Sequence, residues 1–104
     1  MQIVRIQATT NVQWNFFQEE GQYVALCEPL GLTAVGETHS DMLETIQDIS
    51  NHLMRDLVKR GEFEIFLRAK GWSQVGLRTD LPPDQMMFDL PTDIVQRTAS
   101  EALH

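Results

Sequence analysis

The period of the apolar residues changes along the chain. Up to residue 35 apolar positions tend to alternate with polar ones, which is typical of strands with two different faces. The pattern predicts strands over residues 1–7, 12–17, 23–27 and 32–35. Between the second and third, Glu19-Glu20-Gly21-Gln22 favours a hairpin turn, since Gly21 can adopt positive φ. We therefore expect an antiparallel meander; the pattern leaves open whether residues 1–7 join it or pair elsewhere.

A helical period begins at Thr38. Thr38 is a favourable N-cap residue, and Asp41 three residues later resembles a capping box. The apolar residues that follow have the spacing of one buried helical stripe: Met42, Leu43, Ile46, Ile49, Leu53 and Leu57. Lys59 and Arg60 suit the negative end of the helix dipole, and Gly61 suits the position after it. We expect one long helix here, packed on the sheet.

The last third of the chain is predicted to hold shorter elements. They are a helix over 62–70, an edge strand over 72–77, a loop over 78–85, an extended segment over 86–90 and a helix over 91–103. Pro91 in the first turn favours the start of that last helix. The fold class is thus α+β, an antiparallel three- to four-stranded sheet with one long helix packed on it, a short second helix and a C-terminal strand-plus-helix tail. We divide it into a domain, 1–77, and a tail of loop, strand and helix, 78–104, that suits oligomerisation.

The charge of the chain is acidic and unevenly placed. The 104 residues carry a net charge of −7, from 15 acidic against 8 basic side chains. Residues 1–52 hold seven acids and one base (−6), and residues 53–104 hold eight acids and seven bases (−1). Nucleic acid is an unlikely partner for the chain alone, because phosphate binding needs clustered Lys and Arg. An acidic surface suits a basic protein partner, although the charge can also serve solubility alone.

Cysteine and apolar content indicate the compartment. Cys27 is the only cysteine, so an internal disulfide is excluded and a reducing compartment fits. It lies in an apolar run, where a small buried hydrophobe is the expected role. No apolar run approaches the ~20 residues that span a bilayer. We expect a cytoplasmic protein.

Residues that could carry chemistry are few. His39, His52 and His104 share no spacing with each other or with Cys27 that would form a metal site. Glu28 and Glu37 could face each other across the meander, but catalysis by such a pair requires shared burial, and both lie beside turns. We predict no catalytic residue, no metal and no cofactor.

Two other features suggest surfaces. The basic residues Arg55, Lys59, Arg60, Arg68 and Lys70 alternate with acids, which favours a solvated surface over a phosphate groove. The tail has adjacent methionines, which suit an adaptable contact between chains; the alternative is that this segment docks on its own sheet. The predicted oligomer interface comprises Met86, Met87, Phe88, Leu90, Ile94 and Val95.

Several segments of this chain resemble those of a known family and follow each other in the order found in that family. They are Tyr23-Val24-Ala25-Leu26-Cys27-Glu28-Pro29-Leu30-Gly31-Leu32, then Gly36-Glu37-Thr38 leading into a helix, then a short helix ending at Gly71-Trp72. Residues 12–75 resemble the HicB-like antitoxins. The resemblance implies a partial ribonuclease H-like fold without its active site, and a small basic RNA-cleaving toxin, HicA, as the partner.

The tail departs from that family. Members often carry a DNA-binding domain that also makes them oligomers, and Phe88-Asp89-Leu90-Pro91 is similar to the start of a ribbon-helix-helix. That motif needs a second helix, and Asp89 would repel phosphate. Operator binding is therefore not expected, while strand pairing between chains could still give a dimer or tetramer.

Three functions remain, in decreasing order. The first is a non-catalytic antitoxin-type module that binds a basic toxin through acids of the sheet, namely Glu19, Glu20, Glu28 and Glu37. The second is an orphan homo-oligomeric scaffold, with a small ligand held between subunits. The third is a weak hydrolase that uses Glu28 and Glu37.

Overall fold

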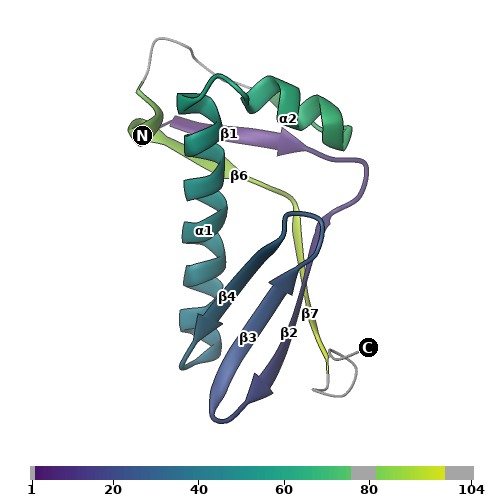
Figure 1. Ribbon diagram of the computed structural model, residues 1–104, viewed down its shortest axis with the longest axis vertical. Coiled ribbons are helices and arrows are strands. Elements are labelled where there is room, and N and C mark those ends of the chain that lie inside the picture. Colours follow the sequence, from purple (N-terminus) through teal and green to yellow (C-terminus); the bar gives the residue numbers. More distant parts are fainter. Residues whose placement is uncertain (1, 76–81, 98–104) are drawn as a thin grey trace. The chain divides into compact units, whose positions relative to one another are not determined.

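A computed structural model of the chain describes residues 2–75 and 82–97. Its strands are β1 (Gln2–Gln7), β2 (Val12–Glu19), β3 (Gln22–Cys27), β4 (Leu32–Gly36), β5 (Ser73–Val75), β6 (Met86–Asp89) and β7 (Thr92–Gln96). Its helices are α1 (His39–Lys59), α2 (Phe63–Lys70) and a short 3₁₀ turn, Pro83–Gln85 (Figure 1). The predicted α+β class with one long and one short helix is confirmed.

The strands form two mixed sheets instead of one antiparallel sheet. One has the order β5-β1-β6, with β1 antiparallel to β5 and parallel to β6. The other has the order β4-β3-β2-β7, in which the predicted meander is extended by β7, parallel to β2. Strand β1, residues 2–7, thus pairs outside the meander, which answers the question that the sequence pattern of residues 1–7 left open.

Two compact units are each discontinuous in sequence. The first comprises, among the described residues, 2–11, 50–75 and 82–91; the second comprises 12–49 and 92–97. Helix α1 contributes its C-terminal half to the first unit and its N-terminal half to the second. Because β6 pairs with β1 and β7 pairs with β2, the predicted tail supplies one strand to each sheet. The boundaries 1–77 and 78–104 stay a prediction.

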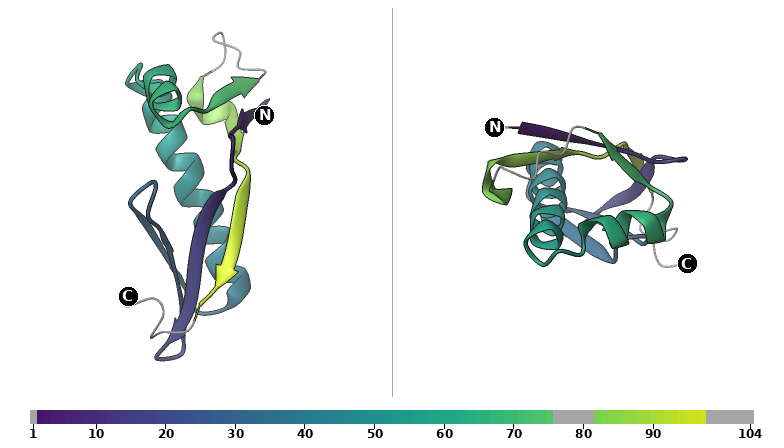
Figure 2. Two further views of the ribbon diagram at one scale, coloured as in Figure 1. Left: turned by 90° about the vertical axis from the view of Figure 1, so that its right-hand side faces the viewer. Right: turned by 90° about the horizontal axis from the view of Figure 1, so that it is seen from above.

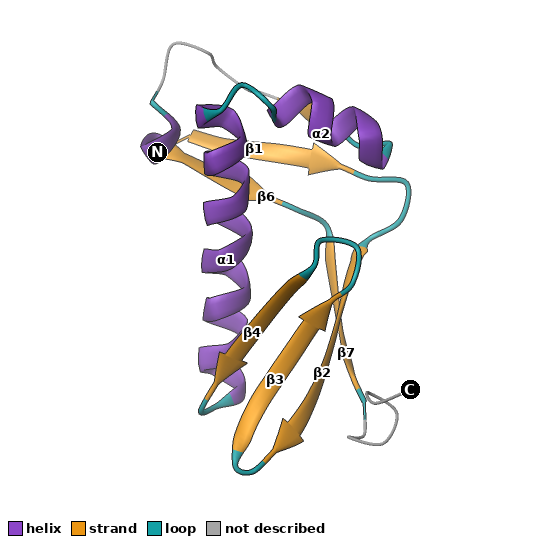
Figure 3. Ribbon diagram, viewed as in Figure 1, coloured by secondary structure: helices purple, strands orange, loops and turns teal. Residues whose placement is uncertain are grey.

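The predicted helix over 91–103 is wrong for Thr92–Gln96, which form strand β7 (Figure 3). Ile94 lies in register with Trp14 and Val95 with Asn15, and the left view of Figure 2 shows β7 running beside β2. Three of its five residues are β-branched, which favours an extended backbone once a partner strand is present. Residues 98–103 of that helix lie outside the described residues. The similarity of residues 88–91 to the start of a ribbon-helix-helix also ends here, because that motif needs a helix after Pro91 and the structure has strand β7.

Local signals elsewhere agree with the structure. The hydroxyl of Thr38 accepts a hydrogen bond of 3.0 Å from the Asp41 N–H, as expected of an N-cap. The turn between β2 and β3 places Glu20 at φ 51° and Gly21 at φ 77°, the left-handed pair that two-residue hairpins require. Strands β5 and β6 lie where an edge strand and an extended segment were predicted.

Each unit has its own apolar core. Unit 1 buries Val4, Ile6, Met54, Leu57, Phe63, Leu67, Met86, Phe88 and Leu90; unit 2 buries Val12, Trp14, Phe16, Phe17, Ala25, Cys27, Ala34, Met42 and Ile46. The helical stripe was predicted only in part. Leu43 is 38% exposed, whereas Met54, absent from the predicted stripe, is fully buried.

Candidate protein-binding surface

Three of the four predicted partner-binding acids lie at one end of the four-stranded sheet. Glu19 ends β2 and Glu20 follows it in the hairpin turn, and both are exposed. Glu37 follows Gly36, the last residue of β4, which lies in register with Tyr23 beside that same turn. The meander therefore gathers Glu19, Glu20 and Glu37 at one end. Figure 1 shows that end, with the turn between β2 and β3 and the end of β4.

Glu28 lies at the opposite end of the meander. It follows β3 and its carbonyl accepts a hydrogen bond of 3.2 Å from the Gly31 N–H in the turn before β4. The five residues of β4, at roughly 3.3 Å per residue, place about 17 Å of strand between Glu28 and Glu37. The expectation that these two carboxylates face each other is thus wrong, because the length of β4 lies between them.

An aromatic cluster adjoins the three acids. The ring of His39, the first residue of α1, lies 5.1 Å from the Phe16 ring and 5.8 Å from the Tyr23 ring, with both contacts edge-to-face. Such arrangements stabilise by about 0.5–1.5 kcal/mol beyond the area that they bury. His39 thus joins the start of α1 to β2 and β3, a packing role that the sequence pattern did not indicate.

The face of the meander away from α1 carries an apolar row. Phe17, Val24 and Val35 are in register across β2, β3 and β4, and side chains in register share one face of a sheet. The other face holds Phe16, Ala25 and Ala34, and Phe16 contacts His39 of α1. Across the row exposure rises from 8% at Phe17 to 45% at Val35, so the row is open toward the β4 edge.

This arrangement suits the binding of another protein. Exposed apolar side chains beside like charges can dock a partner that has apolar residues and Lys or Arg.

Within residues 2–75 and 82–97, no group of three or more His, Cys, Asp or Glu side chains is placed to hold a metal ion. Cys27 is 1% exposed, which confirms the predicted buried hydrophobe. His52 is exposed on α1, and His104 lies outside the described residues.

The predicted oligomer residues are divided between core and surface. Met86, Phe88 and Leu90 are buried inside the chain, and the Phe88 ring lies 5.5 Å from that of Phe63. Met87 is 37% exposed, and Ile94 and Val95 are half-buried. In this conformation Met87, Ile94 and Val95 can contribute to an interface between chains. Met86, Phe88 and Leu90 instead pack inside their own chain, which is the alternative that was predicted for this segment. Oligomerisation itself stays a prediction.

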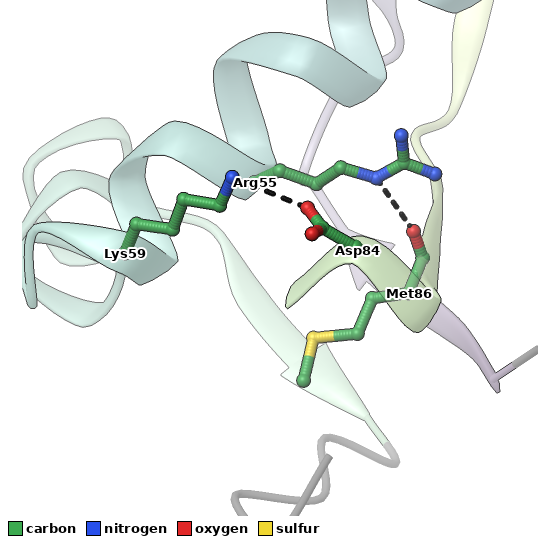
Figure 4. A network of polar contacts seen from close by, with 4 residues as sticks. All are labelled: Arg55, Lys59, Asp84 and Met86. Carbon is green, nitrogen blue, oxygen red and sulfur yellow. Dashed lines mark hydrogen bonds and ion pairs between the residues drawn. The ribbon is translucent and has the colours of Figure 1, made fainter. Parts of the chain in front are cut away.

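Helix α1 covers the outer edge of β6 with polar side chains. Oδ1 of Asn51 accepts a hydrogen bond of 2.7 Å from the Phe88 N–H, and Nε of Arg55 donates one of 2.9 Å to the Met86 carbonyl. One turn further on, Nζ of Lys59 lies 3.2 Å from Oδ1 of Asp84 (Figure 4). The spacings match because four helical residues rise about 6 Å, nearly the length of two strand residues. An edge strand with such cover is protected from pairing with other chains.

The predicted solvated surface is confirmed for Lys59, Arg60, Arg68 and Lys70, which are exposed, whereas Arg55 is partly buried. Arg55 and Lys59 hold β6 and the turn before it, and Arg60 lies 3.0 Å from carboxylate oxygens of both Asp56 and Glu62. Nζ of Lys70 lies over the Phe66 ring, 5.8 Å from its centroid. Sequence reasoning missed the roles of Asn51, Arg55 and Lys59; their i, i+4, i+8 spacing on one helix face was the available signal.

Comparison with known proteins adds no family. Neither the family models nor the curated proteins nor the solved structures give a significant match to this chain. Among the described residues, no helix combines the length and the apolar content that a membrane crossing would need.

Proposed function

We propose that this chain is a non-catalytic, HicB-like antitoxin-type module that binds and neutralises a small basic RNA-cleaving toxin in the cytoplasm. The binding surface is the acidic hairpin end of the four-stranded sheet, with Glu19, Glu20 and Glu37, together with the apolar row that ends at Val35. The observation that carries the proposal is that these acids, separated in sequence, adjoin a partly exposed apolar row.

The element order adds support. The segments that resemble the HicB-like family run through β3, the turn before β4, the step into α1, and α2 with Gly71-Trp72. A three-stranded meander followed by a long helix is also the arrangement that the resemblance implies. Electrostatics support a basic partner as well, because clustered exposed acids accelerate the encounter with a cationic protein.

A direct test uses a small basic protein encoded beside this chain. Affinity of the purified pair is measured by titration calorimetry at two salt concentrations, and RNA cleavage by the basic protein is followed with and without this chain. We expect a stoichiometric complex, suppressed cleavage and weaker binding at high salt, since exposed charges are screened.

The variant Glu19→Lys/Glu20→Lys/Glu37→Lys locates the surface. Three reversals of exposed rim charges should weaken binding by roughly 10- to 100-fold at low salt, mainly through slower association. Glu28→Lys is the matched control, since it reverses the charge of an exposed acid at the far end of the meander. Equal losses for the control and the triple variant, or none for either, would contradict the proposed surface.

The alternative function is a homo-oligomeric scaffold of the same fold without a toxin, possessing a ligand site between subunits. The observation that favours it is the exposed outer face of the three-stranded sheet, which carries Ile3 and Met87 side by side. A stable homo-oligomer that ignores the basic protein would support this alternative over the antitoxin function.

A further inference from the structure

The outer face of the sheet β5-β1-β6 departs from the usual polar surface of a strand. On β1 the side chains of Val4 and Ile6 point into the core, and those of Ile3 and Arg5 point outward. Ile3 is 62% exposed. Most of its side chain therefore stays in water and does not contribute to the chain's own core. It has an apolar neighbour in Met87, 37% exposed and in register with it on β6.

The charged residues two positions further along the same two strands are opposite in sign. Arg5 and Asp89 are in register, with Nε of the arginine 3.7 Å from Oδ2 of the aspartate. Both side chains are well exposed, at 71% and 59%. A pair so open to water contributes little within one chain, because solvent screens it. β1 and β6 therefore present two cross-strand pairs in succession, one apolar and one charged.

This pattern is complementary to itself. β1 and β6 are parallel and in register. A two-fold axis that lies above the outer face, midway between the two strands and parallel to them, therefore places β1 of a second copy over β6 and β6 of that copy over β1. Under that operation Ile3 meets the partner's Met87, and Arg5 meets the partner's Asp89. Each side chain thereby contacts one of complementary character, and each ion pair becomes part of a four-membered charge network.

We propose that a second copy of this chain docks face to face on this sheet, with Ile3, Arg5, Met87 and Asp89 at the centre of the interface. The four residues lie in the first compact unit. The proposal is separate from toxin binding, which uses residues of the second unit, so either can fail without the other.

The expected dimer is weak. Two strands about 4.8 Å apart, each presenting a few residues, make a centre on the order of 200 Å², well below the roughly 800 Å² per partner of a stable complex. Side chains around the centre, such as Val75 at 49% exposure on β5, would add to it. We expect a dissociation constant of about 10–1,000 μM, which concentration-dependent measurements can resolve.

The first experiment measures translational diffusion of the full chain by NMR over a concentration series that extends to about 2 mM, with backbone amide shifts recorded in parallel. Diffusion should slow toward the value of a dimer, and the amide shifts of β1 and β6 should move with the same midpoint. Diffusion that stays that of a monomer throughout, or shifts that move elsewhere, would overturn the proposal.

Matched variants test the centre of the face. Ile3→Glu would bury a carboxylate against the partner's Met87 and should raise the dissociation constant at least about tenfold. The control is Ile65→Glu on α2, where an isoleucine is exposed to a similar degree, 67%, and the constant should stay within about twofold. The proposal fails if Ile3→Glu self-associates as the unchanged chain does.

Charge exchange gives an independent test. Arg5→Glu and Asp89→Arg alone should each weaken the dimer about fivefold or more, since like charges would then meet across the axis. The double variant Arg5→Glu/Asp89→Arg should restore the constant to within about threefold of the original, because the exchanged pairs are again complementary. Single variants that leave the constant unchanged, or a folded double variant that stays as weak as the singles, would overturn the proposal.

Discussion

The backbone N–H of Phe88 donates a hydrogen bond of 2.7 Å to Oδ1 of Asn51, so a buried helix side chain acts on the edge of β6 as a neighbouring strand would. Asn51 is 5% exposed, and Phe88 lies in the core of the same unit. A buried backbone donor needs an acceptor, and at this edge α1 supplies it. The contact joins two segments 37 residues apart.

We predict that Asn51→Ala lowers the free energy of unfolding by about 1–3 kcal/mol, because it removes the acceptor from a buried N–H without removing the donor. Urea denaturation monitored by circular dichroism measures the change. His52→Ala, at the exposed neighbouring position of the same helix, should cost less than about 0.5 kcal/mol. Equal costs for the two variants would contradict a specific role of the contact with β6, because alanine raises the helix propensity at both positions.

Arg55 and Lys59 should differ although both reach the same segment. Arg55→Met keeps the apolar stem but loses the partly buried hydrogen bond to the Met86 carbonyl, and should cost about 1–2 kcal/mol. Lys59→Met breaks an ion pair with Asp84 whose side chains are 54% and 77% exposed, and should cost below about 0.5 kcal/mol. The same urea measurement compares them, and a Lys59→Met cost that matches that of Arg55→Met would contradict this ranking.

Gly36 is the position of the second unit that we expect to tolerate a side chain least. A Cβ there would collide with the backbone N of Met42 in α1 and would lie 2.8 Å from its Cα. Both are backbone atoms, which cannot move aside as the end of a flexible side chain can. Gly36→Ala should therefore destabilise the chain by about 2–3 kcal/mol, measured by thermal or urea unfolding.

Gly21→Ala is the control for that prediction. Gly21 has φ 77°, and a Cβ added to it would meet no atom within 4 Å, so alanine encounters conformational strain alone, at about 1–2 kcal/mol. A larger loss at Gly21 than at Gly36 would mean that the close approach of α1 to β4 is relieved by a small movement of the helix.

Sequence reasoning succeeded where a signal is local. The Thr38 cap and the Glu20-Gly21 turn are each encoded within a few residues, and both are present in the structure, as is the long helix α1 that the apolar repeat predicted. It failed at Thr92–Gln96, since Ile94 and Val95 fit a helical stripe as well as a strand. The parallel partner that decides between them, Trp14 with its neighbours on β2, lies about 80 residues earlier.

The candidate surface was predicted in composition but not in arrangement. The excess of acids before residue 52 is visible in the sequence, and it singled out Glu19, Glu20, Glu28 and Glu37 as one set. Strand direction divides that set, because β4 runs from the end of the meander that holds Glu28 to the opposite end, which holds Glu19, Glu20 and Glu37. Likewise, Ile3 breaks the alternation of its strand, but only the register with β6 places Met87 beside it.

The sequence by itself determined the α+β class, the long capped helix, the β2–β3 hairpin and the acidic character of the first half, since these depend on period, turn residues and charge within short windows. The tertiary structure decided which sheet receives each strand, which acids share an end and which apolar residues stay at the surface. Those features depend on pairing between residues far apart in the chain, and a parallel partner leaves no local trace of its register.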